Sequence, residues 1–123
     1  MTWLSSPSDL PARGSARSPA LLAINVDVSQ DSATVVITGE LDLTTRPLLI
    51  ERLSPVLRTR PGRLVLDMAG TSFIDCGSAR LIASAAQFLP DGRRPVIRHP
   101  SRAVRRVLEL TGADLDCEIE GAP

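Results

Sequence analysis

The sequence predicts an α/β fold in which a small mixed β-sheet carries helices mainly on one face. Two strand-like segments come first, and strand-like and helix-like apolar spacings then alternate along the chain. Crossovers of one hand tend to place successive helices on the same side of such a sheet. A chain of 123 residues can bury a core without disulfides or metal. Because aromatic residues are scarce, that core must consist of Leu, Ile, Val and Ala side chains.

The individual elements are predicted from apolar spacing and from cap and turn residues. Thr44 or Thr45 can cap the first helix, and Pro55 should kink it. Ser101 can cap the last helix, which Gly112 closes as a left-handed residue. The expected strands cover residues 22–28, 33–39, 63–68, 94–98 and 115–119, and the expected helices cover residues 45–59, 77–88 and 101–110.

The stretch from Phe73 to Ser78 carries the most functional information. It follows an apolar run and precedes a helical pattern, so we expect a loop that enters a helix. Asp75 can cap this helix, whose N-terminus has free N–H groups and a partial positive charge that suit a phosphate or another anion. A small side chain placed there would be exposed and easily modified, and in this chain Cys76 directly follows Asp75.

Composition excludes several classes of function. The 14 basic residues, all arginine, equal the 14 acidic ones, whereas a nucleic-acid-binding protein needs a basic excess. Cys76, Cys117 and His99 form no metal-ligand pattern, and a disulfide is unexpected in a reducing compartment. No stretch reaches the roughly 20 apolar residues that span a bilayer, and the N-terminus has no signal-peptide core. We therefore expect a soluble cytoplasmic protein without cofactor, metal, nucleic acid, membrane insertion or small-molecule substrate.

The first 20 residues are rich in Ser, Pro and Gly and have no apolar period. We expect residues 1–20 to be a disordered tail and residues 21–120 to form a single domain. Trp3 in the tail is either an accident of composition or a docking anchor.

Three segments in this order and spacing resemble the STAS domains, which include the bacterial anti-sigma factor antagonists. Residues 73–78 are similar to the segment that carries the phosphorylated serine in that family, where the pattern is roughly Asp-Ser-Ser/Thr-Gly-Leu. Residues 39–44 resemble the family's Gly-Glu-Leu-Asp segment, and residues 100–112 resemble its third-helix segment. The resemblance covers residues 21 to 120.

The resemblance implies a regulatory protein–protein interaction module that influences transcription. Such a module docks on an anti-sigma factor or a related serine kinase or ATPase, and it has no catalytic activity of its own. The loops after the second and third strands then lie side by side and form one partner surface. The implied partner-binding residues are Asp42, Thr44, Asp75, Cys76, Gly77, Ser78 and Arg80. Asp42 can alternatively serve only as a helix cap. A STAS subunit of a lipid-transport ATPase complex is the alternative function.

Cys76 replaces the family's phospho-acceptor serine. Three interpretations stay open: an inert small residue, a thiolate of lowered pKa at the helix N-terminus, or the loss of phosphorylation control. Ser78 is a weak substitute acceptor, because two residues along a helix turn a side chain by about 200°. Thr71 and Ser72 are other weak candidates, expected in a loop.

An enzyme with Cys76 as nucleophile and His99 as base is the remaining hypothesis. The two residues follow neighbouring predicted strands and can therefore lie near each other. Because no orienting third group or oxyanion motif accompanies them, we do not expect an enzyme.

Overall fold

The structure, a computed structural model, describes residues 21–121 of the chain. One sheet holds five strands in the spatial order β1-β2-β3-β4-β5, with β1 antiparallel to β2 and the other neighbours parallel. The strands are β1 (Leu22–Val28), β2 (Ser32–Leu41), β3 (Arg63–Ile74), β4 (Val96–Arg98) and β5 (Glu118–Glu120). The predicted mixed α/β fold is confirmed.

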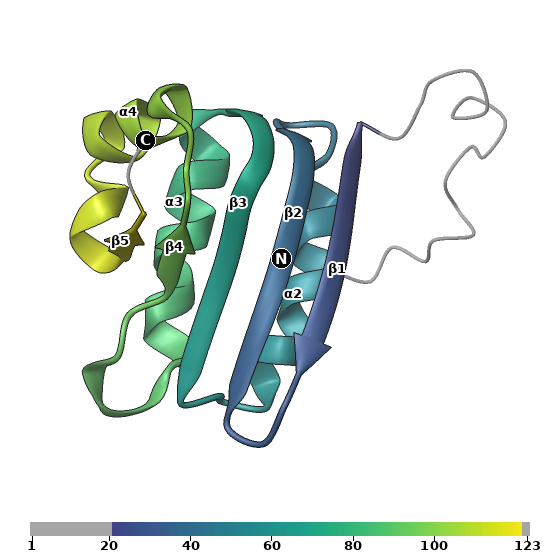
Figure 1. Ribbon diagram of the computed structural model, residues 1–123, viewed down its shortest axis with the longest axis vertical. Helices are drawn as coiled ribbons and strands as arrows, with labels where there is room; N and C mark the ends of the chain where they lie inside the picture. The colour runs from purple at the N-terminus through teal and green to yellow at the C-terminus, as the bar shows by residue number, and fades with distance from the viewer. Residues whose placement is uncertain (1–20, 122–123) are drawn as a thin grey trace, which may run out of the picture.

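The helices cover one face of this sheet. Figure 1 shows α2 behind β1 and β2, α3 behind β3 and β4, and α4 near the top of α3. The α-helices are α2 (Arg46–Arg58), α3 (Cys76–Ser84) and α4 (Arg102–Thr111), and the short 3-10 helices are η2 (Ala85–Phe88), η3 (Pro90–Gly92) and η4 (Ala113–Asp116). Among the described residues, no helix is both long enough and apolar enough to cross a bilayer.

The core lies between the sheet and the helices and is built of aliphatic side chains. Alternate residues of β2 point into it, with Ala33, Val35 and Ile37 all buried. The described phenylalanines, Phe73 and Phe88, are instead about half exposed, at 48% and 49%. β3 contributes Leu64, Leu66 and Met68 to the core. The α-helices contribute Leu49, Leu53, Ile82, Val104 and Leu108.

The prediction that the third strand ends at Met68 was wrong. β3 continues to Ile74, so Phe73, together with Thr71 and Ser72, belongs to a strand and not to a loop. The reason is the partner strand: β2 also extends to Leu41, and the two stay paired through two register shifts. Only Asp75 remains as a link between β3 and α3.

Smaller differences concern the ends of other elements. α3 ends at Ser84 and continues as η2, and β4 begins at Val96 instead of residue 94. The last strand comes later than expected, because the preceding residues close a 3-10 turn after Gly112. α2 continues through Pro55, and a kink there stays a prediction. The expected tail, residues 1–20, lies outside the described residues.

The capping predictions for α3 and α4 agree with the contacts. Asp75 accepts a hydrogen bond from the backbone N–H of Ser78 at 2.8 Å, and Ser101 accepts one from Val104 at 3.1 Å. Gly112 ends α4 with a φ of 78°, a left-handed conformation that glycine adopts without a steric penalty. Local sequence signals therefore fix where the helices that border the site begin.

Candidate functional site

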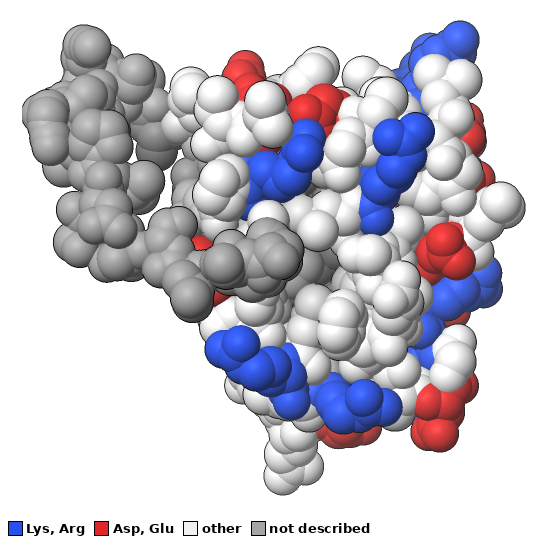
Figure 2. Space-filling view, turned by 180° about the vertical axis from the view of Figure 1, so that it is seen from behind, with Lys and Arg blue, Asp and Glu red and all other residues white. Residues whose placement is uncertain are grey.

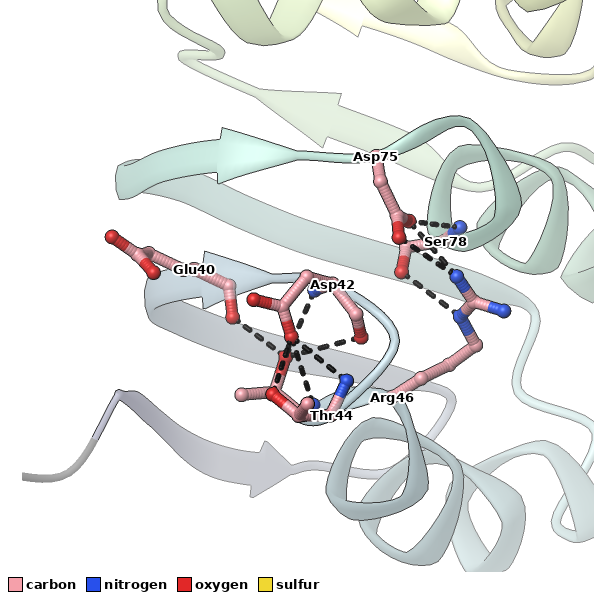
Figure 3. A network of polar contacts seen from close by, with 7 residues as sticks. Glu40, Asp42, Thr44, Arg46, Asp75 and Ser78 are labelled. Atoms are coloured by element: carbon pink, nitrogen blue, oxygen red, sulfur yellow. Dashed lines mark hydrogen bonds and ion pairs between the residues drawn. The ribbon is translucent and has the colours of Figure 1, made fainter.

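The two predicted site loops lie side by side at one edge of the sheet. Leu41 at the end of β2 is paired with Ile74 at the end of β3, and the two strands are parallel. The backbone N–H of Asp75 donates to the carbonyl of Leu41 at 2.9 Å. Asp42 and Asp75, the next residues along each strand, consequently occupy neighbouring positions (Figure 3). In sheets of parallel strands this carboxyl edge is a common place for binding sites.

Asp42 organises the loop that follows β2. Its Oδ1 accepts hydrogen bonds from the backbone N–H of Thr44 at 2.9 Å, the hydroxyl of Thr44 at 2.7 Å and the N–H of Thr45 at 3.1 Å. The hydrogen bond from the Thr44 hydroxyl, followed by those from Thr45 and the Thr44 backbone, keeps the pKa of Asp42 below its ordinary value. All of these contacts join Asp42 with residues at most three positions away, so the loop is stabilised by its own residues.

Thr45 occupies the N-cap position of α2, but its side chain does not cap the helix. Its hydroxyl donates to the carbonyl of Glu40 at 2.7 Å and accepts from the N–H of Asp42 at 2.9 Å. Thr45 therefore fastens the start of the loop, and the predicted capping by a threonine hydroxyl was wrong. Figure 3 labels the two residues that Thr45 contacts, Glu40 near the end of β2 and Asp42 just after it.

Asp75 is held by a residue distant in sequence. Nη2 of Arg46 lies 2.9 Å from Oδ2 and 3.1 Å from Oδ1 of Asp75, and Nε of Arg46 donates to the Ser78 hydroxyl at 3.2 Å. Burial alone would raise the pKa of Asp75, but the hydrogen bonds from Ser78 and the charge of Arg46 outweigh it and leave the pKa lowered. The ion pair is only partly exposed, at 24% for Arg46 and 28% for Asp75.

Arg46 is the site residue that the sequence analysis missed. Its guanidinium lies against Gly77, where an added Cβ would meet Nη2 at 2.5 Å, so a glycine leaves room for this contact. A cation in the first turn of a helix opposes the helix dipole and is unfavourable without a local anion. That unfavourable placement at Arg46 was the one sequence signal that pointed to a carboxylate partner.

The remaining candidate residues differ in accessibility. Thr44, Cys76 and Arg80 are exposed, and Asp42, Asp75 and Gly77 are half-buried. Cys76 is the first residue of α3 and projects from the same edge as the two aspartates. Ser78 is fully buried, so its side chain lies inside the domain and does not contribute to the exposed surface.

The substitute acceptor hydroxyls are not equivalent. Thr71 is buried and donates to the carbonyl of Ile37 at 2.8 Å, and Ser78 is buried beneath Arg46. Ser72 is exposed on β3, with its hydroxyl 3.3 Å from the carbonyl of Gly39. Only Ser72 among these three presents its hydroxyl to solvent.

The pair required by the enzyme hypothesis is not brought together. β4 ends opposite Asp67, whereas Cys76 lies beyond Ile74 at the far end of β3. Six residues of extended strand between the level of His99 and Ile74 correspond to roughly 20 Å. The other cysteine, Cys117, is buried, and burial raises its pKa to about 12, which makes its thiol unreactive. Within residues 21–121 no group of His, Cys, Asp and Glu side chains is arranged to hold a metal ion.

Comparison with known families identifies the segment that contains this site. Residues 24–116 match the family model described as "Mlab, STAS domain", a match that includes both aspartate loops. No curated protein matches the chain.

Solved structures with the same fold include several anti-sigma factor antagonists. One from Mycobacterium paratuberculosis is 23% identical, covers 85% of this chain and 90% of its own, and has a TM-score of 0.75. A putative antagonist from Thermotoga maritima is 20% identical, with coverages of 80% and 86% and a TM-score of 0.69. The Bacillus cell fate determinant SpoIIAA, solved in its phosphorylated form, is 18% identical, with coverages of 80% and 92% and a TM-score of 0.60. At these identities the comparison establishes the fold.

Proposed function

Because this chain belongs to the STAS domain family, we propose that it is a regulatory binding protein of the anti-sigma factor antagonist type. It acts in the bacterial cytoplasm by docking on an anti-sigma factor or a related ATP-binding serine kinase, and it catalyses no reaction. The observation that carries this proposal is the position of exposed Cys76, the first residue of α3, beside the Asp42 loop at the carboxyl edge of the sheet.

The contact surface consists of the accessible members of the site. They are Asp42, Thr44, Asp75, Cys76, Gly77 and Arg80. Ser78 is left out because its side chain is buried. Hydrogen bonds within each loop and the Arg46–Asp75 pair fix the backbone before a partner arrives, so little ordering entropy is lost on binding.

In the proposed mode of action, partner binding is not controlled by a phosphoserine at position 76. Cys76 occupies the acceptor position and has no hydroxyl, while Thr71 and Ser78 are buried. A serine kinase whose cleft fits the first turn of α3 would therefore find no acceptor there. The protein then binds its partner permanently, or its control does not involve phosphorylation at this position.

A quantitative pull-down tests the proposed surface. The full chain and two variants are used as bait, each with ATP and with ADP, and bound proteins are measured by mass spectrometry. Cys76→Arg should lose a partner of the ATP-binding kinase class, because a long cation cannot fit a contact shaped for a small side chain. Leu110→Arg is the matched control, since Leu110 is exposed on α4 and belongs to neither site loop. Equal recovery by all three baits would contradict the proposed surface.

A STAS subunit of a lipid-transport ATPase complex is the second candidate. The observation that favours it is the description of the matching family, which carries the name Mlab. The same experiment separates the two candidates, because the recovered partner is a regulatory kinase in one case and a transport ATPase in the other. An enzyme based on Cys76 is not proposed, given the distance between Cys76 and His99.

A further inference from the structure

We propose that the groove between α2 and the α3–η2 segment is a second docking surface, which takes an amphipathic helix with an acidic polar face from a partner protein. The groove has a volume of about 410 Å³. It is lined by Ile50, Leu53, Ser54, Leu57, Arg58, Leu81, Ser84, Gln87 and Phe88. The inference goes beyond the proposed function and uses none of the residues in the proposed contact at Asp42 and Cys76.

The apolar side chains of the groove form two helical stripes. Ile50, Leu53 and Leu57 follow one another at spacings of three and four residues along α2. Leu81 and Phe88, seven residues apart, form the opposite wall. Of these residues only Leu53 is buried, and Phe88 is 49% exposed. Two parallel stripes with unfilled space between them are the geometry in which a helix packs by its own apolar face.

The charge of the helix layer decides which kind of helix fits. The two α-helices that border the groove, α2 and α3, carry four arginines against one glutamate, and one of the four, Arg46, is paired with Asp75. Figure 2 shows this face with an uncharged centre and blue arginines around it, while most of the red acidic residues lie toward its edges. Arg58 lines the groove itself, and none of the lining residues is acidic. A partner with an acidic polar face is attracted by this rim, whereas a basic face is repelled.

Other occupants fit the groove less well. Residues 1–20 contain two arginines and one aspartate, so their net charge is positive, like that of the arginines around the groove, and is repelled by them. A second copy would bring its own arginine-rich helix layer against this one. Arginine attracts an anionic bilayer surface. A protein binds such a surface by inserting protruding apolar side chains, however, and not through a hollow between two helices. An acidic helix satisfies both the shape and the charge.

Fluorescence polarisation with two labelled synthetic peptides tests the proposal. Both are about 14 residues long, roughly 20 Å as a helix, with leucine on one face. One carries glutamate on the other face, and its twin carries lysine. The full chain should bind the glutamate peptide about tenfold or more tightly than the lysine peptide, and added salt should reduce that preference.

Two groove variants and two controls locate the binding. Phe88→Glu and Arg58→Glu should each weaken the glutamate peptide by about tenfold, since one removes an apolar contact and the other reverses the rim charge. Leu110→Glu and Arg106→Glu introduce the same changes in net charge at exposed positions of α4, and they should change affinity by less than about twofold.

Several outcomes would overturn the proposal. They are binding of neither peptide, equal binding of both, and equal losses in groove and control variants. Tighter binding after removal of residues 1–18 would assign the groove to the tail. A dimer that Phe88→Glu dissociates would assign it to a second copy. Stronger binding to phosphatidylglycerol vesicles than to the glutamate peptide, lost in Phe88→Glu, would assign it to a membrane surface.

Discussion

The loops that follow β2 and β3 occupy equivalent places in the sheet, but they are held in different ways. The Asp42 loop is fixed by hydrogen bonds among residues 40–45. The Asp75 link is fixed by Arg46, which lies 29 residues away in the sequence and belongs to α2. One loop therefore depends on its own sequence, and the other depends on the packing of two helices against the sheet.

This difference matters for a binding surface that two loops share. A local turn keeps its shape when the surrounding helices shift slightly, because every donor and acceptor moves with it. The Asp75 carboxylate instead connects the first turn of α2 with the first turn of α3, through Arg46 and the Ser78 N–H. A displacement of either helix therefore changes the position of Cys76, the first residue of α3.

The largest expected effect follows from placing a phosphate in only one of the loops. Cys76→Ser should become a phospho-acceptor for the cognate kinase, whereas exposed Thr44 in the Asp42 loop should not. A phosphoserine at position 76 adds about −1.5 to −2 charge beside two aspartates, at a helix N-terminus that favours it. Partner affinity should then fall by about 100-fold, or ~2.7 kcal/mol, because this charge is repelled and poorly solvated inside an interface.

The measurement incubates wild type and Cys76→Ser with the kinase and ATP, maps phosphates by mass spectrometry and titrates the partner. Unphosphorylated Cys76→Ser is the control for the substitution itself. Stoichiometric phosphate on Ser72, Thr71 or Ser78 of the wild type would contradict the prediction, because regulation would then use another hydroxyl.

The next largest effect is the loss of thermal stability when Asp75 is replaced, compared with the loss when Asp42 is replaced. Asp75→Ala removes a helix cap, a loss of about 1 kcal/mol, and leaves Arg46 without its anion, so we expect a total loss of about 2 kcal/mol. For a domain of this size that corresponds to a decrease in Tm of roughly 8 °C or more. Asp42→Ala should lower Tm by less than half as much, since its contacts are solvated and local.

Differential scanning calorimetry of the two variants and of Asp75→Asn makes this comparison. Asparagine can still accept the hydrogen bond of the Ser78 N–H, so Asp75→Asn should fall between wild type and Asp75→Ala. Equal shifts for Asp42→Ala and Asp75→Ala would mean that the long-range contact through Arg46 adds nothing to the local one.

Much of this arrangement could be predicted from local sequence signals. Asp75, Ser101 and Gly112 mark helix ends by their own side-chain and backbone preferences, and the alternation in β2 marks its buried face. The order of strands and helices follows from such signals, because each extends over only a few residues.

The parts that could not be predicted depend on pairing across the chain. Residues 69–72, Ala-Gly-Thr-Ser, are all small, which is typical of a turn, yet they continue β3 because β2 provides paired backbone groups beside them. The contact of Arg46 with Asp75 exists only once β2 and β3 are parallel and in register. The same packing buries the side chain of Ser78. Helical spacing in the sequence predicted only that this side chain points in another direction than that of residue 76.

A smaller effect is expected from acid. The pKa of Asp75 and that of Asp42 are both lowered in the folded protein. Their contribution to stability is therefore fully present above the ordinary pKa of 3.8 and is lost as the pH falls through the lower, folded values. Between about pH 7 and pH 5 these groups should leave Tm unchanged, and below about pH 4 Tm should decrease.

Thermal unfolding of wild type, Asp42→Asn and Asp75→Asn from pH 7 to pH 2.5 tests this sign. Each variant should show a flatter acid limb than wild type. Added salt should reduce the Asp75 contribution more than that of Asp42, because part of the former is the charge of Arg46, whereas hydrogen bonds dominate the latter. Acid limbs that are identical in all three proteins would show that neither carboxylate is stabilised as a charge.

The smallest effect is expected from the N-terminal 18 residues. The contacts that hold the two loops all join residues between 39 and 78, so both arrangements are complete within the proposed domain of residues 21–120. The segment before it has few apolar residues to offset an ordering entropy of roughly 1–2 kcal/mol per residue. Removal of residues 1–18 should therefore change Tm by less than about 1 °C and leave the acid limb intact. A drop of several degrees, reversed by restoring only residues 3 and 4 on a glycine-serine linker, would instead show that Trp3 and Leu4 pack on the domain.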